Sequence, residues 1–139
     1  MPTDVTRAII DDYFTTYRAW GDPEDTAAFF SDDADWDIPG PVERAFWIGP
    51  RKGRAGVAAF IRDLRAAIEP IRYEIKSIVV DGDTAVVLGE LSSRIKSTGK
   101  VFESEFATAF TIADGRIVRY RMYEDGYGLA RACEPDPAP

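Results

Sequence analysis

Apolar residues in the N-terminal half of the chain recur at spacings of three and four, which is the period of a helix with one buried face. This pattern predicts a helix from about residue 4 to 20. A second, short helix is expected to begin at Asp22, because its side chain can cap the helix and Pro23 suits the first helical position. A third helix carries an apolar stripe over residues 57 to 68, and Pro70 is expected to end it. The N-terminal half therefore predicts three helices.

After residue 70 the hydrophobic period changes from that of a helix to the alternation of a strand. Asp-Gly and Thr-Gly pairs, which are typical of tight turns, divide this part of the chain into segments. Strands are expected near residues 71 to 80, 84 to 96, 100 to 112 and 116 to 124. Successive strands joined by tight turns run antiparallel, so this half of the chain predicts an antiparallel sheet.

The even-numbered positions of the last two strands are predicted to face the inside of the sheet. In the first of these strands they carry Phe106 and Thr108, and in the second they carry Tyr120 and Met122. Even positions pair with even positions only if the connecting loop has three residues, 113 to 115, so the sequence predicts that loop. Thr108 would then lie opposite Tyr120. In the same register Phe106 would lie opposite Met122.

The composition is that of one domain with an acidic surface. The chain has 139 residues, 45% of them hydrophobic, which is enough to bury one core. We expect one domain over residues 1 to 132 and a short disordered tail over residues 133 to 139. The net charge of −7 argues against nucleic acid and anionic membranes as partners, because those need clustered Lys and Arg. No apolar run approaches the roughly 20 residues of a membrane helix, and the start lacks a signal-peptide pattern, so a cytoplasmic protein is expected.

The chain contains no histidine, which restricts its chemistry. Ser-His-Asp and Cys-His nucleophilic mechanisms are excluded, and so is metal ligation by imidazole. The single cysteine, Cys133, has no partner for a disulfide and belongs to no zinc-binding spacing. We therefore expect no metal and no cofactor, and any acid or base must be a carboxylate, tyrosine, lysine or arginine.

An acidic stretch, FFSDDADWDIPGP, follows the predicted second helix. Three of its aspartates have the spacing of the first half of a calcium-binding loop. Ile38 stands where that loop requires glycine and Arg44 where it requires glutamate, so the calcium interpretation fails. In a short strand over residues 34 to 38, Trp36 would occupy the inner face. Asp37 would then point away from it unless a bulge turned it inward.

Three short motifs and the order of the predicted elements resemble a known family. The motifs are Gly-Asp at 21 and 22, F-x-D-D-A at 30 to 34 and D-G-R-I-V at 114 to 118. From about residue 5 to 132 the chain resembles the SnoaL-like group of the nuclear transport factor 2-like superfamily, which also contains ketosteroid isomerase and limonene epoxide hydrolase. The resemblance implies an α+β cone, in which three N-terminal helices pack in the concave face of a curved antiparallel sheet. It also implies a pocket for a small apolar ligand and a homodimer formed through the sheet.

The catalytic residues of these relatives are not retained at the matching positions. By resemblance to ketosteroid isomerase, its tyrosine donor falls on Phe14, its aspartate base on Ile38 and its protonated aspartate on Thr108. The His-x-Asp pattern of the polyketide cyclases falls on Tyr120 and Met122, and the Arg-x-Asp pair of the epoxide hydrolases has no counterpart. The resemblance therefore implies the scaffold, and catalytic roles have to be sought among other residues.

Glu124 is the first candidate for a general base, because a carboxylate at the mouth of an aromatic pocket has its pKa raised by desolvation. A glutamate at the end of a strand is also a common solvated rim residue. Asp37 is a second candidate for the base, and Tyr17 and Tyr120 are candidates for hydrogen-bond donors to a ligand. The predicted ligand-binding residues are Tyr13, Phe14, Trp36, Trp47, Leu91, Phe106, Thr108 and Met122. For the aromatic members of this set, packing in the core is the simpler alternative.

Three functions are open on this sequence. The first is a pocket protein for an apolar, carbonyl-bearing or polycyclic small molecule that works as a cofactor-free isomerase, cyclase or hydrolase. The second is a binding protein without catalysis, which the missing family residues favour. The third is a dimeric interaction module whose pocket is filled by its own aromatic side chains.

Overall fold

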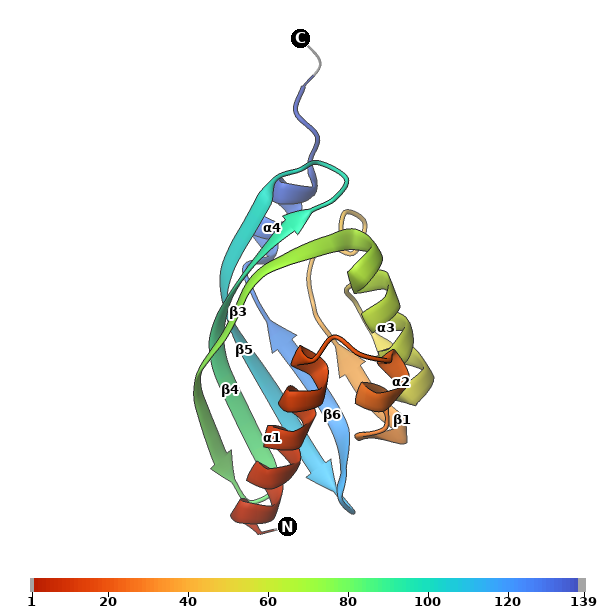
Figure 1. The fold of residues 1–139 in the computed structure, drawn as a ribbon, viewed down its shortest axis with the longest axis vertical. Coiled ribbons are helices and arrows are strands. Elements are labelled where there is room, and N and C mark those ends of the chain that lie inside the picture. Colours follow the sequence, from red (N-terminus) through yellow and green to blue (C-terminus); the bar gives the residue numbers. More distant parts are fainter. Residues whose placement is uncertain (1, 138–139) are drawn as a thin grey trace.

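In residues 2 to 137, the part of the chain that the computed structural model describes, six strands form one curved sheet and helices lie against one face of it (Figure 1). The helices are α1 (Thr3–Arg18), α2 (Pro23–Ala27), α3 (Gly53–Ala67) and α4 (Gly126–Cys133). The strands are β1 (Phe30–Asp37), β2 (Arg51–Lys52), β3 (Ile68–Asp81), β4 (Thr84–Ile95), β5 (Val101–Ala113) and β6 (Arg116–Tyr123). The predicted α+β class is therefore confirmed.

The predicted caps and apolar faces explain the first helices. α1 buries Ile10 and Phe14 on its apolar side. At the start of α2 the Asp22 carboxylate accepts a hydrogen bond from the Glu24 backbone N–H at 3.0 Å, and Pro23 is the first helical residue, as predicted.

No helix among the described residues is long and apolar enough to cross a membrane.

α3 ends earlier than the proline signal indicates. It buries Val57 and Phe60 and ends at Ala67, because Ile68 is extended (φ −133°, ψ 156°) and begins β3. The expectation that Pro70 ends this helix is wrong, since Pro70 lies within β3. β3 is an edge strand, where a residue without an N–H group is tolerated.

The sheet is mixed rather than antiparallel. Its strand order is β2-β1-β6-β5-β4-β3, and every neighbouring pair is antiparallel except β1 and β6, which run parallel with Trp36 beside Tyr120. The predicted antiparallel sheet is correct for β3 to β6 and wrong for the β1–β6 pair. These two strands lie far apart in the sequence, so no tight turn dictates their relative direction.

The turn between β5 and β6 has two residues, so the predicted three-residue loop is wrong. Asp114 (φ 51°) and Gly115 (φ 75°) both have positive φ, and Ala113 pairs with Arg116. This is the type I′ geometry, whose twist matches that of a hairpin. Aspartate and glycine are among the few residues that tolerate the conformation.

A bulge at Val118 restores the predicted facing of β6. The pairing register shifts by one residue after Ile112, which makes Val118 the extra residue. Beyond the bulge even positions pair with even positions, as predicted. The register nevertheless differs by two residues from the prediction, because Thr108 lies opposite Met122 and not opposite Tyr120.

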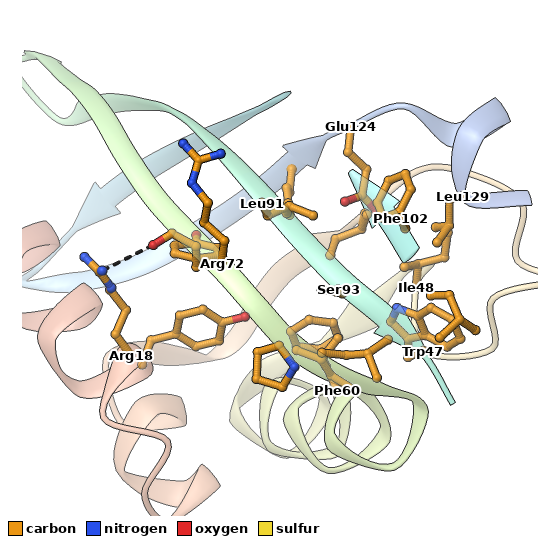
Figure 2. A pocket seen from close by; sticks show the side chains of 18 of the residues that line it. Arg18, Trp47, Ile48, Phe60, Arg72, Leu91, Ser93, Phe102, Glu124 and Leu129 are labelled. Atoms are coloured by element: carbon orange, nitrogen blue, oxygen red, sulfur yellow. Dashed lines mark hydrogen bonds between the residues drawn. The ribbon is translucent and has the colours of Figure 1, made fainter. Parts of the chain in front are cut away.

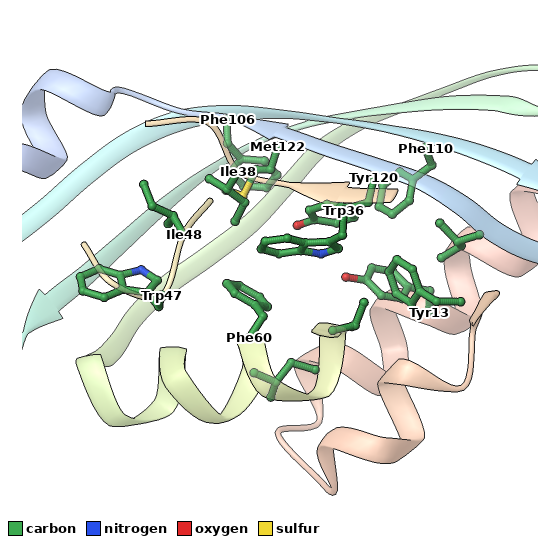
Figure 3. Close-up of a cluster of buried hydrophobic side chains, with 14 of the residues drawn as sticks. Tyr13, Trp36, Ile38, Trp47, Ile48, Phe60, Phe106, Phe110, Tyr120 and Met122 are labelled. Carbon is green, nitrogen blue, oxygen red and sulfur yellow. The ribbon is translucent and has the colours of Figure 1, made fainter. Parts of the chain in front are cut away.

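An aromatic core lies between the helices and the inner face of the sheet (Figure 3). The even positions of β5 from 102 to 112 are buried or partly buried, which confirms the predicted inner face. Trp36 stacks on Tyr120 with ring centroids 5.1 Å apart, and the ring centroids of Trp36 and Phe60 of α3 are 4.3 Å apart. The ring centroids of Tyr13 of α1 and Phe110 are 5.5 Å apart. These ring contacts join α1 and α3 to the sheet.

α4 is a helix that the sequence pattern does not indicate. Asp125 caps it by accepting a hydrogen bond from the Gly128 N–H at 2.9 Å, and Leu129 is buried. Glycines in its first turn lower its helix propensity, which explains the weak signal. Cys133, the first residue of the predicted tail, is the last residue of α4. Residues 138 and 139 of that tail lie outside the described residues.

Candidate functional site

A cavity of about 340 Å³ lies between the helices and the inner face of the sheet. Its wall is built from the end of α1, the loop after β1, α3, inner positions of β3 to β6, and α4. The wall is mostly apolar. Hydroxyl and charged groups come from Tyr17, Arg18, Arg72, Tyr73, Ser93, Tyr120 and Glu124. An apolar cavity with a few polar groups is the usual form of a small-molecule site.

Glu124 directs its side chain into this cavity (Figure 2). It follows β6 on the same face as Tyr120 and Met122, because residues two positions apart share one face of a strand. The next residue, Asp125, caps α4, and its backbone N–H donates to Ser104 Oγ at 3.0 Å. The end of the strand and the start of the helix therefore set the direction of Glu124.

Burial raises the pKa of Glu124 to about 7, and the negative charge of Asp125 adds to the effect. Within residues 2 to 137 no cationic side chain forms an ion pair with this carboxylate. Near neutral pH some molecules therefore carry a charged Glu124, which can accept a proton, and others carry a neutral Glu124, which can donate one. Both forms are what an acid–base catalyst needs.

Tyr17, Tyr73 and Tyr120 bring phenol groups to the cavity wall. Burial raises the pKa of all three, and that of Tyr17 reaches about 12, with the Glu124 charge as the second cause and Arg65 acting in the opposite direction. The ring centroids of Tyr17 and Tyr73 are 5.8 Å apart. The charge of Glu124 acts on each of these phenols, so they share one site with it. The phenols stay protonated at neutral pH and can donate hydrogen bonds to a ligand.

Two arginines belong to the described wall as well. Arg72 of β3 is ion-paired with Glu74 and Glu90. Arg18, in the last turn of α1, donates from Nη2 to the backbone oxygen of Tyr73 at 3.2 Å. Guanidinium groups at a cavity wall can bind a carboxylate or another anionic oxygen of a ligand.

The cavity brings together part of the predicted site. The predicted residues on its wall are Tyr17, Trp47, Leu91, Tyr120, Met122 and Glu124. The predicted residues that are buried in the surrounding core and do not line it are Tyr13, Phe14, Trp36, Phe106 and Thr108. Asp37, at the end of β1, does not line the cavity either. Its Oδ1 is buried without a hydrogen-bond partner in the described part of the chain.

Sequence reasoning missed Tyr73, Arg18 and Arg72. In β3 the register shifts after Pro70 and again after Ile75, which interrupts the alternation that would have marked Tyr73 as inward-facing. The signal that could have found it is cross-strand pairing, because Tyr73 lies opposite a predicted binding residue, Leu91. The arginines gave no signal of their own, since a charged residue in a helix or strand usually faces solvent.

In the described part of the chain no three histidine, cysteine, aspartate or glutamate side chains converge as metal ligands would. The wall presents a carboxylate, phenols and guanidinium groups. Together these groups can transfer a proton and hold a carbonyl or anionic oxygen.

Known proteins share this fold and part of the sequence. The family model of the SnoaL-like domain matches residues 10 to 120. An NTF2-like protein from Burkholderia xenovorans LB400 is 29% identical, with a TM-score of 0.85 and a match that covers 96% of this chain and 99% of that one. TerC, crystallised with polyporic acid, is 19% identical, with a TM-score of 0.79 and coverage of 93% and 98%. A protein of ketosteroid isomerase-like fold from Catenulispora acidiphila DSM 44928, in complex with trimethylamine, is 18% identical, with a TM-score of 0.69 and coverage of 87% and 92%.

No curated protein matches the sequence. The last two structural similarities, at 19% and 18% identity, show the fold alone. The family model is the stronger finding, because it spans residues 10 to 120 and so includes most of the elements that build the cavity. Glu124 and α4 lie beyond the matched residues. The chain belongs to the SnoaL-like domain family, within the NTF2-like superfamily.

Proposed function

We propose that the protein binds an apolar, carbonyl-bearing small molecule in the cavity and moves a proton on it without a cofactor, as an isomerase or cyclase does. The single observation that carries the proposal is the carboxylate of Glu124. It lies in an apolar cavity, its pKa is raised to about 7, and it has no cationic partner among the described residues. A partly buried carboxylate with such a pKa suits general base catalysis near neutral pH.

The reaction begins when the Glu124 carboxylate takes a proton from the carbon beside the ligand's carbonyl group. The electron pair of the broken C–H bond moves to the carbonyl oxygen and forms an enolate, and Tyr17 or Tyr120 donates a hydrogen bond to that oxygen. If a C=C bond of the ligand is conjugated with the enolate, Glu124, now neutral, returns the proton to the far carbon of that bond, and the double bond shifts into conjugation with the re-formed carbonyl group, which gives an isomer. In a cyclase the enolate carbon instead attacks a second carbonyl group of the same molecule, and Glu124 protonates the resulting alkoxide.

The cavity suits a ligand of modest size. Its volume, about 340 Å³, is at the lower end of the roughly 300–1,000 Å³ of small-molecule pockets. Trp47, Phe60 and Leu91 supply apolar wall. Proteins of the same fold were solved with polyporic acid and with trimethylamine, which supports a small-molecule role for this chain.

Hydrogen–deuterium exchange at carbon tests the proposal without knowledge of the natural substrate. 2-Tetralone, an apolar bicyclic ketone with C–H bonds beside its carbonyl group, is incubated with the protein in D₂O, and exchange is followed by proton NMR. We expect the wild type to accelerate exchange and Glu124→Gln to lose at least about 100-fold of that acceleration, since general base catalysis contributes about 10²–10⁴-fold. Glu103→Gln, at an exposed position of β5, is the matched control and should keep the activity. Acceleration that survives in Glu124→Gln would contradict the proposal.

A second function, ligand binding without catalysis, is favoured by one observation. The positions of the isomerase's catalytic residues hold Phe14, Ile38 and Thr108 here, none of which can act as a base. This function predicts that 2-tetralone binds equally well to the wild type and to Glu124→Gln, and that neither accelerates exchange. The interaction module with a filled pocket is not proposed, because the cavity of about 340 Å³ is not filled by the protein's own side chains.

We also propose that two copies of the chain associate through the outer face of the sheet. Leu88, Ala107 and Tyr123 are cross-strand neighbours on that face, and Val79 lies beside Val86 in the next row. The residues Val79, Leu88 and Tyr123 are 57%, 43% and 51% exposed. A second copy of the sheet would cover this apolar group.

A further inference from the structure

The cavity has an acidic end and a basic end. Figure 2 shows Arg18 and Glu124 at opposite ends of the pocket. Arg72 also belongs to the wall, but its guanidinium group is already paired with Glu74 and Glu90. In residues 2 to 137 no carboxylate pairs with Arg18. Arg18 is therefore the cation of the described wall whose charge the protein itself does not compensate.

Arg18 is exposed, and its guanidinium group makes one hydrogen bond to β3. Its Nη2 donates to the backbone oxygen of Tyr73 at 3.2 Å, and its Cζ lies 6.0 Å from the centre of the Tyr73 ring. Its other N–H groups have no acceptor among the described residues. A planar guanidinium group with free N–H groups is preorganised for a carboxylate, which can accept two parallel hydrogen bonds from it.

A second arginine adds positive potential at this end. Arg65 lies with its Cζ 4.6 Å from the centre of the Trp20 ring, and Trp20 is part of the cavity wall. The Nε of Arg65 is buried and has no hydrogen-bond partner among the described residues. The Arg65 charge opposes the rise in the pKa of Tyr17, so its field reaches the wall. In a chain of net charge −7, this end is a local positive region that favours an anion.

We infer that the ligand is an organic acid whose anionic group binds at Arg18 and whose apolar body extends toward Glu124. The inference rests on the proposed function and names its substrate class, an apolar oxo acid with the carboxylate at one end and the reacting carbonyl group at the other. The reverse orientation is unfavourable, because the ligand's carboxylate would then lie beside Glu124 without a cation. An anchor at Arg18 also orients the reacting carbon toward the base, which is how remote binding groups assist catalysis.

Two ligands that differ only in charge test this inference. 2-Naphthylacetic acid and 2-naphthylacetamide share one apolar body, and their affinities for the full chain are measured by isothermal titration calorimetry at neutral pH and low salt. We expect the acid to bind at least about 10-fold more tightly than the amide, and the difference to shrink as salt is added. Arg18→Gln should remove the difference. Arg18→Lys, which keeps the charge but not the fork of donors, should retain part of it.

Arg7→Gln is the matched control. Arg7 also lies on α1, and its Nη2 donates to a backbone oxygen of β3, that of Ile78, at 3.0 Å, but it does not line the cavity. This variant should keep the preference for the acid. Equal affinities of acid and amide for the wild type, or a preference that survives in Arg18→Gln, would overturn the inference.

Two further results separate this inference from the proposed function. Glu124→Gln should still bind the acid more tightly than the amide, because the preference comes from Arg18 and not from the base. If the acid shows no preference while exchange of 2-tetralone still depends on Glu124, the substrate class is wrong and the proton-transfer proposal stands. If neither naphthyl compound nor 2-tetralone binds, both proposals fail.

Discussion

At the scale of single residues, Glu124 owes its chemistry to its surroundings. A glutamate in water has a pKa well below neutrality. In the cavity, burial raises the pKa of Glu124 to about 7, whereas Glu103 on β5 stays exposed to solvent. The folded state therefore binds the Glu124 proton more tightly than the unfolded state does, and this difference makes the stability of the fold depend on pH.

We predict that Glu124→Gln gains stability relative to the wild type as the pH rises. The folded-state pKa of about 7 lies above the ordinary value of 4.5, so the stabilisation by protonated Glu124 is complete below pH 4.5 and is lost as the pH rises through 7. Between pH 4.5 and about 8, the free energy of unfolding of the variant should rise by about 3 kcal/mol relative to the wild type. Urea unfolding at several pH values measures this difference. Glu103→Gln controls for the amide substitution, and a difference between Glu124→Gln and the wild type that stays constant with pH would contradict the prediction.

At the scale of elements, the β5–β6 hairpin shows which structural features a hydrophobic pattern can predict and which it cannot. The two-residue turn of Asp114 and Gly115 would by itself reverse the facing of β6, and the bulge at Val118 reverses it again. The alternation of apolar residues indicates the net facing correctly, because burial selects the apolar side. The alternation cannot reveal the two-residue turn and the bulge, because their effects on the facing cancel. The predicted loop and register were therefore wrong, while the predicted inner face was confirmed.

The middle of β4 requires a glycine. Gly89 lies between Ile75 of β3 and Phe106 of β5, and an added Cβ would overlap the backbone oxygen of Glu74 and the ring of Phe106. We predict that Gly89→Ala lowers the free energy of unfolding by about 1–3 kcal/mol, measured by urea denaturation. Gly21→Ala is the control, because an added Cβ there meets no atom within 4 Å, and it should change stability by less than about 0.5 kcal/mol. Similar effects of the two substitutions would refute the packing explanation.

At the scale of the whole molecule, the two faces of the sheet differ in what they present. The inner face carries the cavity, and α1 and α3 lie on that side (Figure 1). The outer face carries the exposed row of Leu88, Ala107 and Tyr123, which no other element of the described chain covers. A protein with its binding site on one side of a sheet can therefore use the other side for association without closing the site.

We predict that the wild type sediments at twice the chain mass of 15.4 kDa and that Leu88→Glu sediments at that mass itself. The substitution would bury a carboxylate without a partner in the middle of the apolar row. Sedimentation equilibrium measures both masses. Val5→Glu, at a 44% exposed position of α1, is the control and should leave the dimer intact. A wild type at the mass of one chain would rule out the proposed interface.

The sequence by itself determined the type and order of most elements, the inner face of β5 and the lack of histidine chemistry, because these follow from spacing along the chain and from composition. It also marked Glu124 as a candidate base. Only the tertiary structure decided the parallel partner of β1 and the presence of Tyr73 and Arg18 on the cavity wall. These depend on which distant segments lie side by side, and bulges and strand pairing set that arrangement. The raised pKa of Glu124 also depends on the tertiary structure, since desolvation is the combined effect of neighbours from many parts of the chain.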